Sequence, residues 1–152
     1  MRKKLFIIIV LLLSFCLTGC SIKRTITPEK FKSITKNYKL SSKDVSSHFK
    51  NVEQIKSVIV ADSDDLWNIE FYVFKDNDSA KDMYKKNKKY YNENKTTAKS
   101  TDIHSTRNSD DFTVVGVESY MHVCRIKNTL VYVYAPIDYK VDVEKVIRAL
   151  KY

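Results

Sequence analysis

The chain contains very little glycine, and this scarcity excludes several kinds of active site. Gly19 and Gly116 are the two glycines among 152 residues. Phosphate-binding loops of the dinucleotide and P-loop types need clustered glycines, so that the backbone can approach the phosphate closely. The nucleophile elbow of many hydrolases also needs flanking glycines. The sequence therefore predicts neither kind of site.

A long hydrophobic run is also missing. The mainly apolar stretch over residues 5–17 is shorter than the roughly 20 residues that a spanning helix requires. It is followed within a few positions by Ser21, Lys23 and Arg24. This argues against a transmembrane anchor, which is the simplest alternative explanation of the N-terminus.

The N-terminus instead has the order of a secretion signal. Arg2, Lys3 and Lys4 precede the apolar run, and Leu17-Thr18-Gly19-Cys20 closes it. A positive start, a short apolar region and small residues before the cut are what a signal peptidase needs. The last four residues resemble the lipobox of bacterial lipoproteins. This resemblance implies a signal peptide over residues 1–19 and a diacylglyceryl thioether on Cys20, which becomes the new N-terminus.

A lipid anchor of this kind would place the protein on the outer face of the cell membrane. Two acyl chains hold a protein stably at a bilayer, whereas one chain gives only marginal binding. A secreted protein cut at another position is a third alternative, but it leaves the thiol of Cys20 without an evident use.

Cysteines are too few for a disulfide in the processed protein. Of the three, Cys16 leaves with the signal and Cys20 is acylated, so Cys124 remains alone. Stability must then come from packing, although the compartment permits disulfides. Cys124 alternates with Tyr120, His122 and Ile126, which predicts a small buried residue rather than a nucleophile.

The charge balance is strongly basic. Removal of Arg2, Lys3 and Lys4 lowers the formal charge from +9 to +6. A basic domain at a membrane surface attracts anionic lipid or a phosphate-rich wall polymer. Nucleic acid is not expected as a partner outside the cytoplasm.

The processed chain is long enough for one domain. Removing 19 of 152 residues leaves 133, which suits a single hydrophobic core rather than the two lobes of a solute-binding protein. We expect a lipidated N-terminus and spacer over residues 20–25 and one domain over residues 26–152.

Hydrophobic periodicity predicts three helices in this domain. Thr27 and Pro28 start the first, which ends near Lys39. The second begins at Asn77 or Asp78, and its apolar side comprises Ala80, Met83, Tyr84, Asn87, Tyr90 and Tyr91. Valine, isoleucine and leucine over residues 143–150 predict the third. Residues 41–55 are less regular and are compatible with a short helix.

Alternating or continuous apolar runs predict five strands, over residues 58–61, 66–74, 112–118, 120–126 and 130–135. The tight links between them favour antiparallel pairing. We therefore predict an α+β fold in the order α-β-β-α-β-β-β-α. In this fold a five-stranded, mainly antiparallel sheet carries its helices mainly on one face. Residues 92–111 are polar throughout and predict a mobile loop.

No cluster of catalytic or metal-ligating residues is evident in the sequence. His48, His104 and His122 are far apart in the predicted elements. A catalytic pairing of His122 with Cys124 is disfavoured, because an activated thiolate needs accessible, electropositive surroundings. We therefore predict no catalytic residue, no cofactor-binding residue and no metal ligand.

Two acidic stretches, residues 62–65 and 76–78, resemble fragments of calcium-binding loops, but the comparison with an EF-hand fails. Counting from Asp62, position six is Trp67 and position twelve is Val73, where an EF-hand needs glycine and glutamate. Turn formation and helix capping explain both stretches. Glu70 lies within an apolar strand, where it either faces solvent, pairs with a lysine or is a buried acid.

Two surfaces are candidates for binding. The polar side of the second helix carries Lys81, Lys85, Lys88 and Lys89, which would attract phosphates. The alternative is an ordinary solvated helix face. Tyr72, Tyr132 and Tyr134 form a second candidate, on a sheet face that we expect opposite the helices. They would either bind a partner or belong to the core.

The mature sequence resembles the small lysine-rich lipoproteins of Gram-positive bacteria that have no assigned activity. The resemblance rests on residues 71–74, 80–84 and 125–133 and carries over no catalytic residue. We therefore expect a non-enzymatic binding or interaction module, tethered to the bilayer through Cys20. Its partners would be anionic lipid, wall polymer or another envelope protein. The alternative is a small envelope enzyme whose site forms only in three dimensions, from His122, Cys124 or Glu70.

Overall fold

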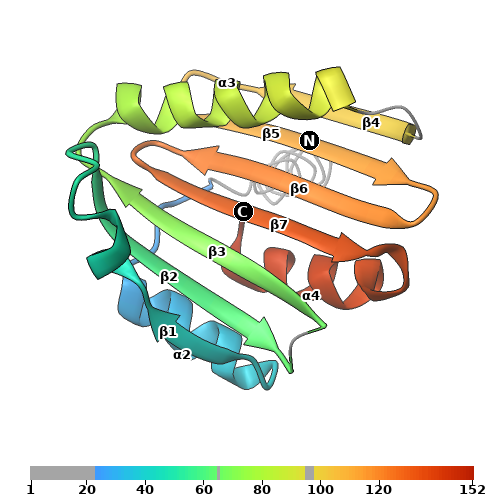
Figure 1. The fold of residues 1–152 in the computed structure, drawn as a ribbon, viewed down its shortest axis with the longest axis horizontal. Helices are drawn as coiled ribbons and strands as arrows, with labels where there is room; N and C mark the ends of the chain where they lie inside the picture. Colours follow the sequence, from blue (N-terminus) through green and yellow to red (C-terminus); the bar gives the residue numbers. More distant parts are fainter. Residues whose placement is uncertain (1–22, 65, 95–97) are drawn as a thin grey trace, which may run out of the picture.

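A single antiparallel sheet of seven strands organises the chain, with helices on both faces (Figure 1). The computed structural model describes residues 23–64, 66–94 and 98–152. The strand order is β1-β2-β3-β7-β6-β5-β4. The predicted signal over residues 1–19 and Cys20 lie outside the described residues, as do Asp65 and residues 95–97.

The described helices and strands follow one another in this order along the chain. They are α2 (Pro28–Asn37), β1 (Ser41–Asp44), the 3₁₀ helix η1 (Ser46–Phe49), β2 (Ile55–Ser63), β3 (Trp67–Phe74), α3 (Asn77–Asn94), β4 (Ala98–Ser105), β5 (Ser109–Gly116), β6 (Ser119–Ile126), β7 (Thr129–Pro136), the 3₁₀ helix η2 (Ile137–Tyr139) and α4 (Lys140–Leu150). Every pairing in the sheet is antiparallel.

The predicted five-stranded sheet is wrong, because it omits the strands at both edges. β1 and β4 are mostly exposed and almost entirely polar. Edge strands bury little, so they lack the apolar alternation by which a strand is recognised in a sequence. Backbone pairing with β2 and β5 defines them instead.

The sequence predicts a mobile loop over residues 92–111, but most of the described residues in this range belong to regular elements. α3 continues to Asn94, β4 occupies residues 98–105, and β5 begins at Ser109. Ile103 pairs with Phe112 in the register of the β4–β5 hairpin. Over residues 98–105, pairing with β5 therefore defines a strand whose side chains are mostly exposed.

The remaining strands and helices confirm the periodicity argument. β2 pairs with β3 as a hairpin, and β5, β6 and β7 form the expected meander. At the start of α2, the Thr27 hydroxyl accepts a hydrogen bond from the Lys30 N–H at 3.2 Å. The cap of α3 differs from the prediction, because the Asp76 carboxylate accepts from the Ser79 N–H at 2.8 Å. Asn77 is the first residue of that helix.

α2 and α4 cover one face of the sheet, called here the α2/α4 face. Phe31 of α2 stacks on Phe71 of β3 with ring centroids 5.1 Å apart. Tyr152 contacts the same Phe71 ring edge-on at 6.3 Å. The apolar side of α4 consists of Val143, Val146, Ile147 and Leu150, all buried in this core.

α3 covers the opposite face, called here the α3 face. Ala80 and Tyr84 of α3 pack with Phe112, Val123 and Leu130 in a second core. The expectation of helices mainly on one face thus holds for α2 and α4 but not for α3. Because helices cover β6 on both sides, all its residues from Tyr120 to Ile126 are buried.

The α3 face also contains a buried ion pair. The Arg125 Nε atom donates to the Asp110 carboxylate at 2.6 Å, and both side chains are almost fully buried. A second Arg125 nitrogen donates to the Lys127 carbonyl at 2.9 Å. The Asp110 carboxylate thus compensates the charge of a guanidinium that has little solvent contact.

Candidate functional site

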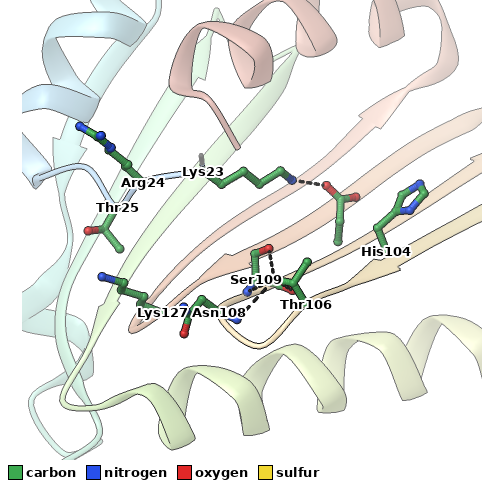
Figure 2. Close-up of a pocket in the computed structure, with 9 residues that line it drawn as sticks. Lys23, Arg24, Thr25, His104, Thr106, Asn108, Ser109 and Lys127 are labelled. Carbon is green, nitrogen blue, oxygen red and sulfur yellow. Dashed lines mark hydrogen bonds and ion pairs between the residues drawn. The ribbon is translucent and has the colours of Figure 1, made fainter. Parts of the chain in front are cut away.

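A pocket beside the start of the described chain is the first candidate site. It encloses about 760 Å³ and lies on the α2/α4 face, next to β4 and β5, and we call it the N-terminal pocket. Its lining comprises Lys23, Arg24, Thr25, His104, Thr106, Asn108, Ser109, Asp111 and Lys127 (Figure 2).

The tight β4–β5 turn forms one wall of this pocket. The Thr106 N–H donates to the Ser109 carbonyl at 2.7 Å. The Thr106 hydroxyl accepts from the Ser109 N–H at 3.0 Å. The neighbouring β6–β7 turn is attached to it, because the Lys127 N–H donates to the Asn108 carbonyl at 2.8 Å.

Strand register brings Asp111, which lines the pocket, together with two buried side chains, Cys124 and His122. Asp111 lies opposite Cys124 in the β5–β6 pairing, and Thr113 lies opposite His122. Lys23 extends from the N-terminal segment towards the Asp111 carboxylate, with its Nζ atom 3.0 Å away (Figure 2). The same Nζ atom lies 3.6 Å from the Cys124 sulfur.

Burial sets the charge states in this group. Burial raises the pKa of the Cys124 thiol to about 12, and the Asp111 carboxylate adds to the rise. Burial lowers the pKa of His122 below its ordinary value and outweighs the opposite effect of Asp111. The thiol and the imidazole are therefore both neutral near pH 7, and the 3.7 Å approach of His122 to Asp111 is not an ion pair.

Lys23 supplies the positive charge of the group. Burial acts to lower the pKa of Lys23, but the Cys124 sulfur and the Asp111 carboxylate outweigh it and raise that pKa. The Lys23 ammonium is therefore charged at pH 7 and faces the Asp111 carboxylate. They form an ion pair at the partly buried base of the pocket.

Asp111, His122 and Cys124 each offer one donor atom to a metal ion. Ligand atoms of Asp111, His122 and Cys124 lie within 4.8 Å of one another, and Zn²⁺ accepts such O, N and S donors. The Lys23 ammonium already lies against two of these three groups. A metal ion would have to displace it and to ionise a thiol with a strongly raised pKa. We therefore interpret the group as an ion pair with neutral neighbours.

The Nδ1 atom of His122 lies 2.9 Å from the Thr113 hydroxyl. Its buried Nε2 atom has no hydrogen-bond partner within the described part of the chain. The Thr113 hydroxyl therefore holds this histidine on its Nδ1 side.

The sequence predicts that the three histidines lie far apart, but the structure brings His104 to the group around Asp111. His104 pairs with Asp111 in the β4–β5 register and lines the pocket, whereas His48 is exposed in η1. The sequence prediction missed Asp111 because it started this strand at Phe112. Alternation of Asp111 with Thr113 and Val115 is the signal that would have placed its side chain on the α2/α4 face.

The four lysines of the predicted anion-binding surface lie on α3. Lys81, Lys85 and Lys89 are exposed, and Lys88 is partly buried. Lys85 and Lys89 approach Asp82 and Glu93 at 3.8 Å, and all four of these side chains are mostly exposed. Exposed pairs of this kind contribute little, so the helix retains a basic surface. α3 lies on the face of the sheet opposite α2 and α4 (Figure 1). The N-terminal pocket therefore lies on the other side of the sheet from these lysines.

A second pocket lies on the α3 face, beside the last turns of α3. It encloses about 620 Å³, and we call it the tyrosine pocket. Its lining comprises Asn68, Glu70, Tyr90, Tyr91, Ala98, Val114, Gly116, Ser119, Met121, Tyr132 and Tyr134. Tyr132 and Tyr134 belong to the predicted tyrosine set, but the sheet face that carries them is covered in part by a helix. Tyr72 lies beside this pocket and donates a hydrogen bond to Glu70.

Comparisons with known proteins add little. No protein-family model matches the chain, and no curated protein matches it. A solved structure described as a GTP binding regulator from Thermotoga maritima is similar over 82% of this chain and 84% of that chain. The TM-score is 0.48 and the sequence identity is 19%, so the similarity supports no argument about function. Within the described residues, no helix is long and apolar enough to cross a membrane.

Proposed function

We propose that this protein is a lipid-anchored, extracytoplasmic binding module without enzymatic activity, and that its ligand is an anionic component of the envelope. The anchor rests on the similarity of Leu17-Thr18-Gly19-Cys20 to a lipobox. The proposal of an anionic ligand rests on the position of Lys23. This residue lines the N-terminal pocket and follows Cys20 by three residues. Three residues span at most about 10 Å, so a bilayer that holds Cys20 would face this pocket.

The charges of the N-terminal pocket suit an anionic ligand. Lys23 is neutralised by Asp111. No ion pair is present for the side chains of Arg24 and Lys127 within the described residues. Each such cation near an anionic surface contributes about 1 kcal/mol. A phosphate head group at the pocket would therefore meet two uncompensated charges.

The lysines of α3 are a second candidate contact. They lie on the opposite side of the sheet, so a tether near Lys23 would direct them away from the same bilayer. In this orientation Lys81 and Lys88 would face the wall polymer. The two surfaces therefore predict different ligands.

Intact mass spectrometry of the membrane fraction tests the anchor. We expect a protein that begins at Cys20 and carries diacylglycerol, and we expect Cys20→Ser to lack both the lipid and the cleavage. A wild-type protein that retains residues 1–19 without added lipid mass would contradict the proposal.

Vesicle binding tests the surface. A protein lacking residues 1–20 should bind anionic vesicles, and binding should weaken as salt rises, because screening acts over about 8 Å at physiological ionic strength. Arg24→Glu with Lys127→Glu should weaken binding at least about tenfold, which corresponds to 1.4 kcal/mol. Lys85→Glu with Lys88→Glu is the matched control, since it changes the net charge by the same amount. A larger loss in the control would assign lipid binding to α3.

Thiol labelling tests the enzymatic alternative. A thiol with a pKa of about 12, compared with an ordinary 9.0, carries roughly a thousandfold less thiolate at pH 8. Native Cys124 should therefore react with iodoacetamide at least about a hundredfold more slowly than the urea-unfolded chain. Equal rates would indicate an accessible, activated thiol and would favour an enzyme.

A further inference from the structure

The tyrosine pocket combines aromatic rings with a carboxylate. Glu70 of β3 pairs with Tyr132 of β7 in the sheet register, and Asn68 pairs with Tyr134. All four side chains therefore lie on the α3 face, where successive alternate residues share one side. The last turns of α3 add Tyr90 and Tyr91 above them.

The tyrosines contact one another and also line the cavity. The Tyr91 and Tyr132 hydroxyls are hydrogen-bonded, and their ring centroids lie 6.4 Å apart. The Tyr90 ring is perpendicular to Tyr91 at 5.2 Å. Tyr134 is 53% exposed at the mouth of the pocket. Helix and sheet thus present several ring surfaces to one cavity.

Among the residues that the structure describes, Glu70 has no cationic partner. It accepts a hydrogen bond from the Tyr72 hydroxyl. Within the described part of the chain, no lysine, arginine or histidine nitrogen lies within 4.0 Å of its carboxylate. Burial raises the pKa of Glu70 and outweighs the hydrogen bond from Tyr72, which acts to lower it, while the nearby Asp62 carboxylate adds to the rise. This half-buried carboxylate therefore has no ion-pair partner among the described lysines and arginines.

A bound cation would interact favourably with both the tyrosine rings and the Glu70 carboxylate. The faces of tyrosine rings attract ammonium groups within about 6 Å of the ring centre, and a half-buried carboxylate gains from a charged partner. The cavity of about 620 Å³ lies within the range that small-molecule sites occupy. A neutral sugar would also stack on tyrosine, but it would leave the charge of Glu70 uncompensated.

We propose that the tyrosine pocket binds a small organic ammonium ion, whose charge pairs with Glu70 and whose alkyl groups lie against Tyr132 and Tyr134. This site is independent of the N-terminal pocket, because it lies on the other face of the sheet. It gives the protein a cation-binding side in addition to its proposed anion-binding side.

Binding of choline to the full chain, solubilised in a neutral detergent, tests this proposal. The matched probe is 3,3-dimethylbutan-1-ol, which has the shape of choline without its charge. Calorimetry should show choline binding at least about tenfold more tightly than this alcohol, a difference of 1.4 kcal/mol. Methylammonium and lysine methyl ester extend the test to primary amines.

Variants locate the site. Glu70→Gln preserves shape and should weaken choline binding about tenfold, whereas Glu53→Gln, at an exposed position outside the pocket, should have no effect. Tyr134→Ala should weaken binding about threefold and Tyr134→Phe should restore it, since the ring face supplies the cation–π attraction. An unchanged thermal midpoint in the Tyr134 variants would show that folding is unaffected.

Three outcomes would overturn the proposal. The first is equal binding of choline and the neutral alcohol, which would indicate an apolar or sugar-binding pocket. The second is choline binding that is unchanged in Glu70→Gln. The third is the failure of all three ammonium probes to bind at roughly 10 mM, a concentration that detects millimolar affinity.

Discussion

The two faces of the sheet differ most clearly along one strand. In β7, Val131, Val133 and Ala135 point to the α2/α4 face and are fully buried. Tyr132 and Tyr134 alternate with them on the α3 face, where Tyr134 is 53% exposed. α2 and α4 both pack on the first face and enclose these three β7 side chains. One helix crosses the second face, and larger amphipathic residues occupy the space that it leaves open.

The buried charges differ in a corresponding way. Asp110 faces the α3 side and is paired with Arg125 inside the core, with little solvent contact. Its neighbour Asp111 faces the other side and is paired with Lys23 at a pocket. Asp110 and Asp111, which are adjacent in β5, thus belong to two different ion pairs, one in the core and one at the N-terminal pocket. We expect the first to determine folding and the second to influence the site.

The largest expected effect is in the core of the α2/α4 face. Phe71→Ala should destabilise the domain by about 4 kcal/mol, because it removes the ring on which Phe31 and Tyr152 pack. Urea unfolding followed by circular dichroism measures this. Tyr134→Ala is the comparison on the α3 face and should cost less than about 1 kcal/mol. Similar costs for the two variants would show that the faces are equally packed.

The buried pair on the α3 face should have the next largest effect. Asp110→Ala leaves the Arg125 guanidinium buried without its carboxylate and should cost about 3 kcal/mol in urea unfolding. The double variant Asp110→Ala with Arg125→Met removes both charges, so it should recover most of this loss. A single-variant cost below about 1 kcal/mol would mean that water reaches the arginine.

The ion pair at the N-terminal pocket should matter less. Lys23→Met removes the partner of Asp111, whose side chain is 17% exposed, and should cost about 1 kcal/mol by the same measurement. Arg24→Met alters the adjacent residue, which is exposed, and should be neutral within about 0.5 kcal/mol. Equal costs would show that Lys23 contributes through its alkyl chain rather than its charge.

The smallest expected effect is a gain in stability rather than a loss. Burial raises the pKa of Glu70 above its unfolded value, so stability that is present below the unfolded pKa is lost as pH rises through the folded pKa. Glu70→Gln does not titrate and should be more stable than wild type at pH 7, by roughly 0.5 kcal/mol. The gain should vanish near about pH 4, where the wild-type carboxyl is protonated. Thermal melts at both pH values measure it, and a loss at pH 7 would contradict an unpaired acid.

Central elements were predictable from the sequence because each carries its own pattern. The spacing from Val143 to Leu150 predicts α4, and the alternation over β5 and β6 predicts their pairing. The edge strands β1 and β4 carry no such pattern, since their order comes from a neighbour's backbone. Missing β4 also hid the approach of His104 to Asp111.

The candidate sites show the same limit. The sequence identified Tyr132 and Tyr134 as one set but did not connect them with Tyr90 and Tyr91, which come from a helix more than 40 positions earlier. It left Glu70 with three open interpretations. The β3–β7 register and the end of α3 decided between them by placing the acid among tyrosines.

The sequence by itself determined the helices, the central strands, the single free thiol of the described chain and the predicted lipid-attachment residue, Cys20. These follow from short-range periodicity and from local motifs that need no distant partner. Only the tertiary structure decided which face α3 covers, that Lys23 reaches Asp111, and that Glu70 lies in an aromatic pocket. Each of these depends on burial between segments far apart in the chain, which no local pattern contains.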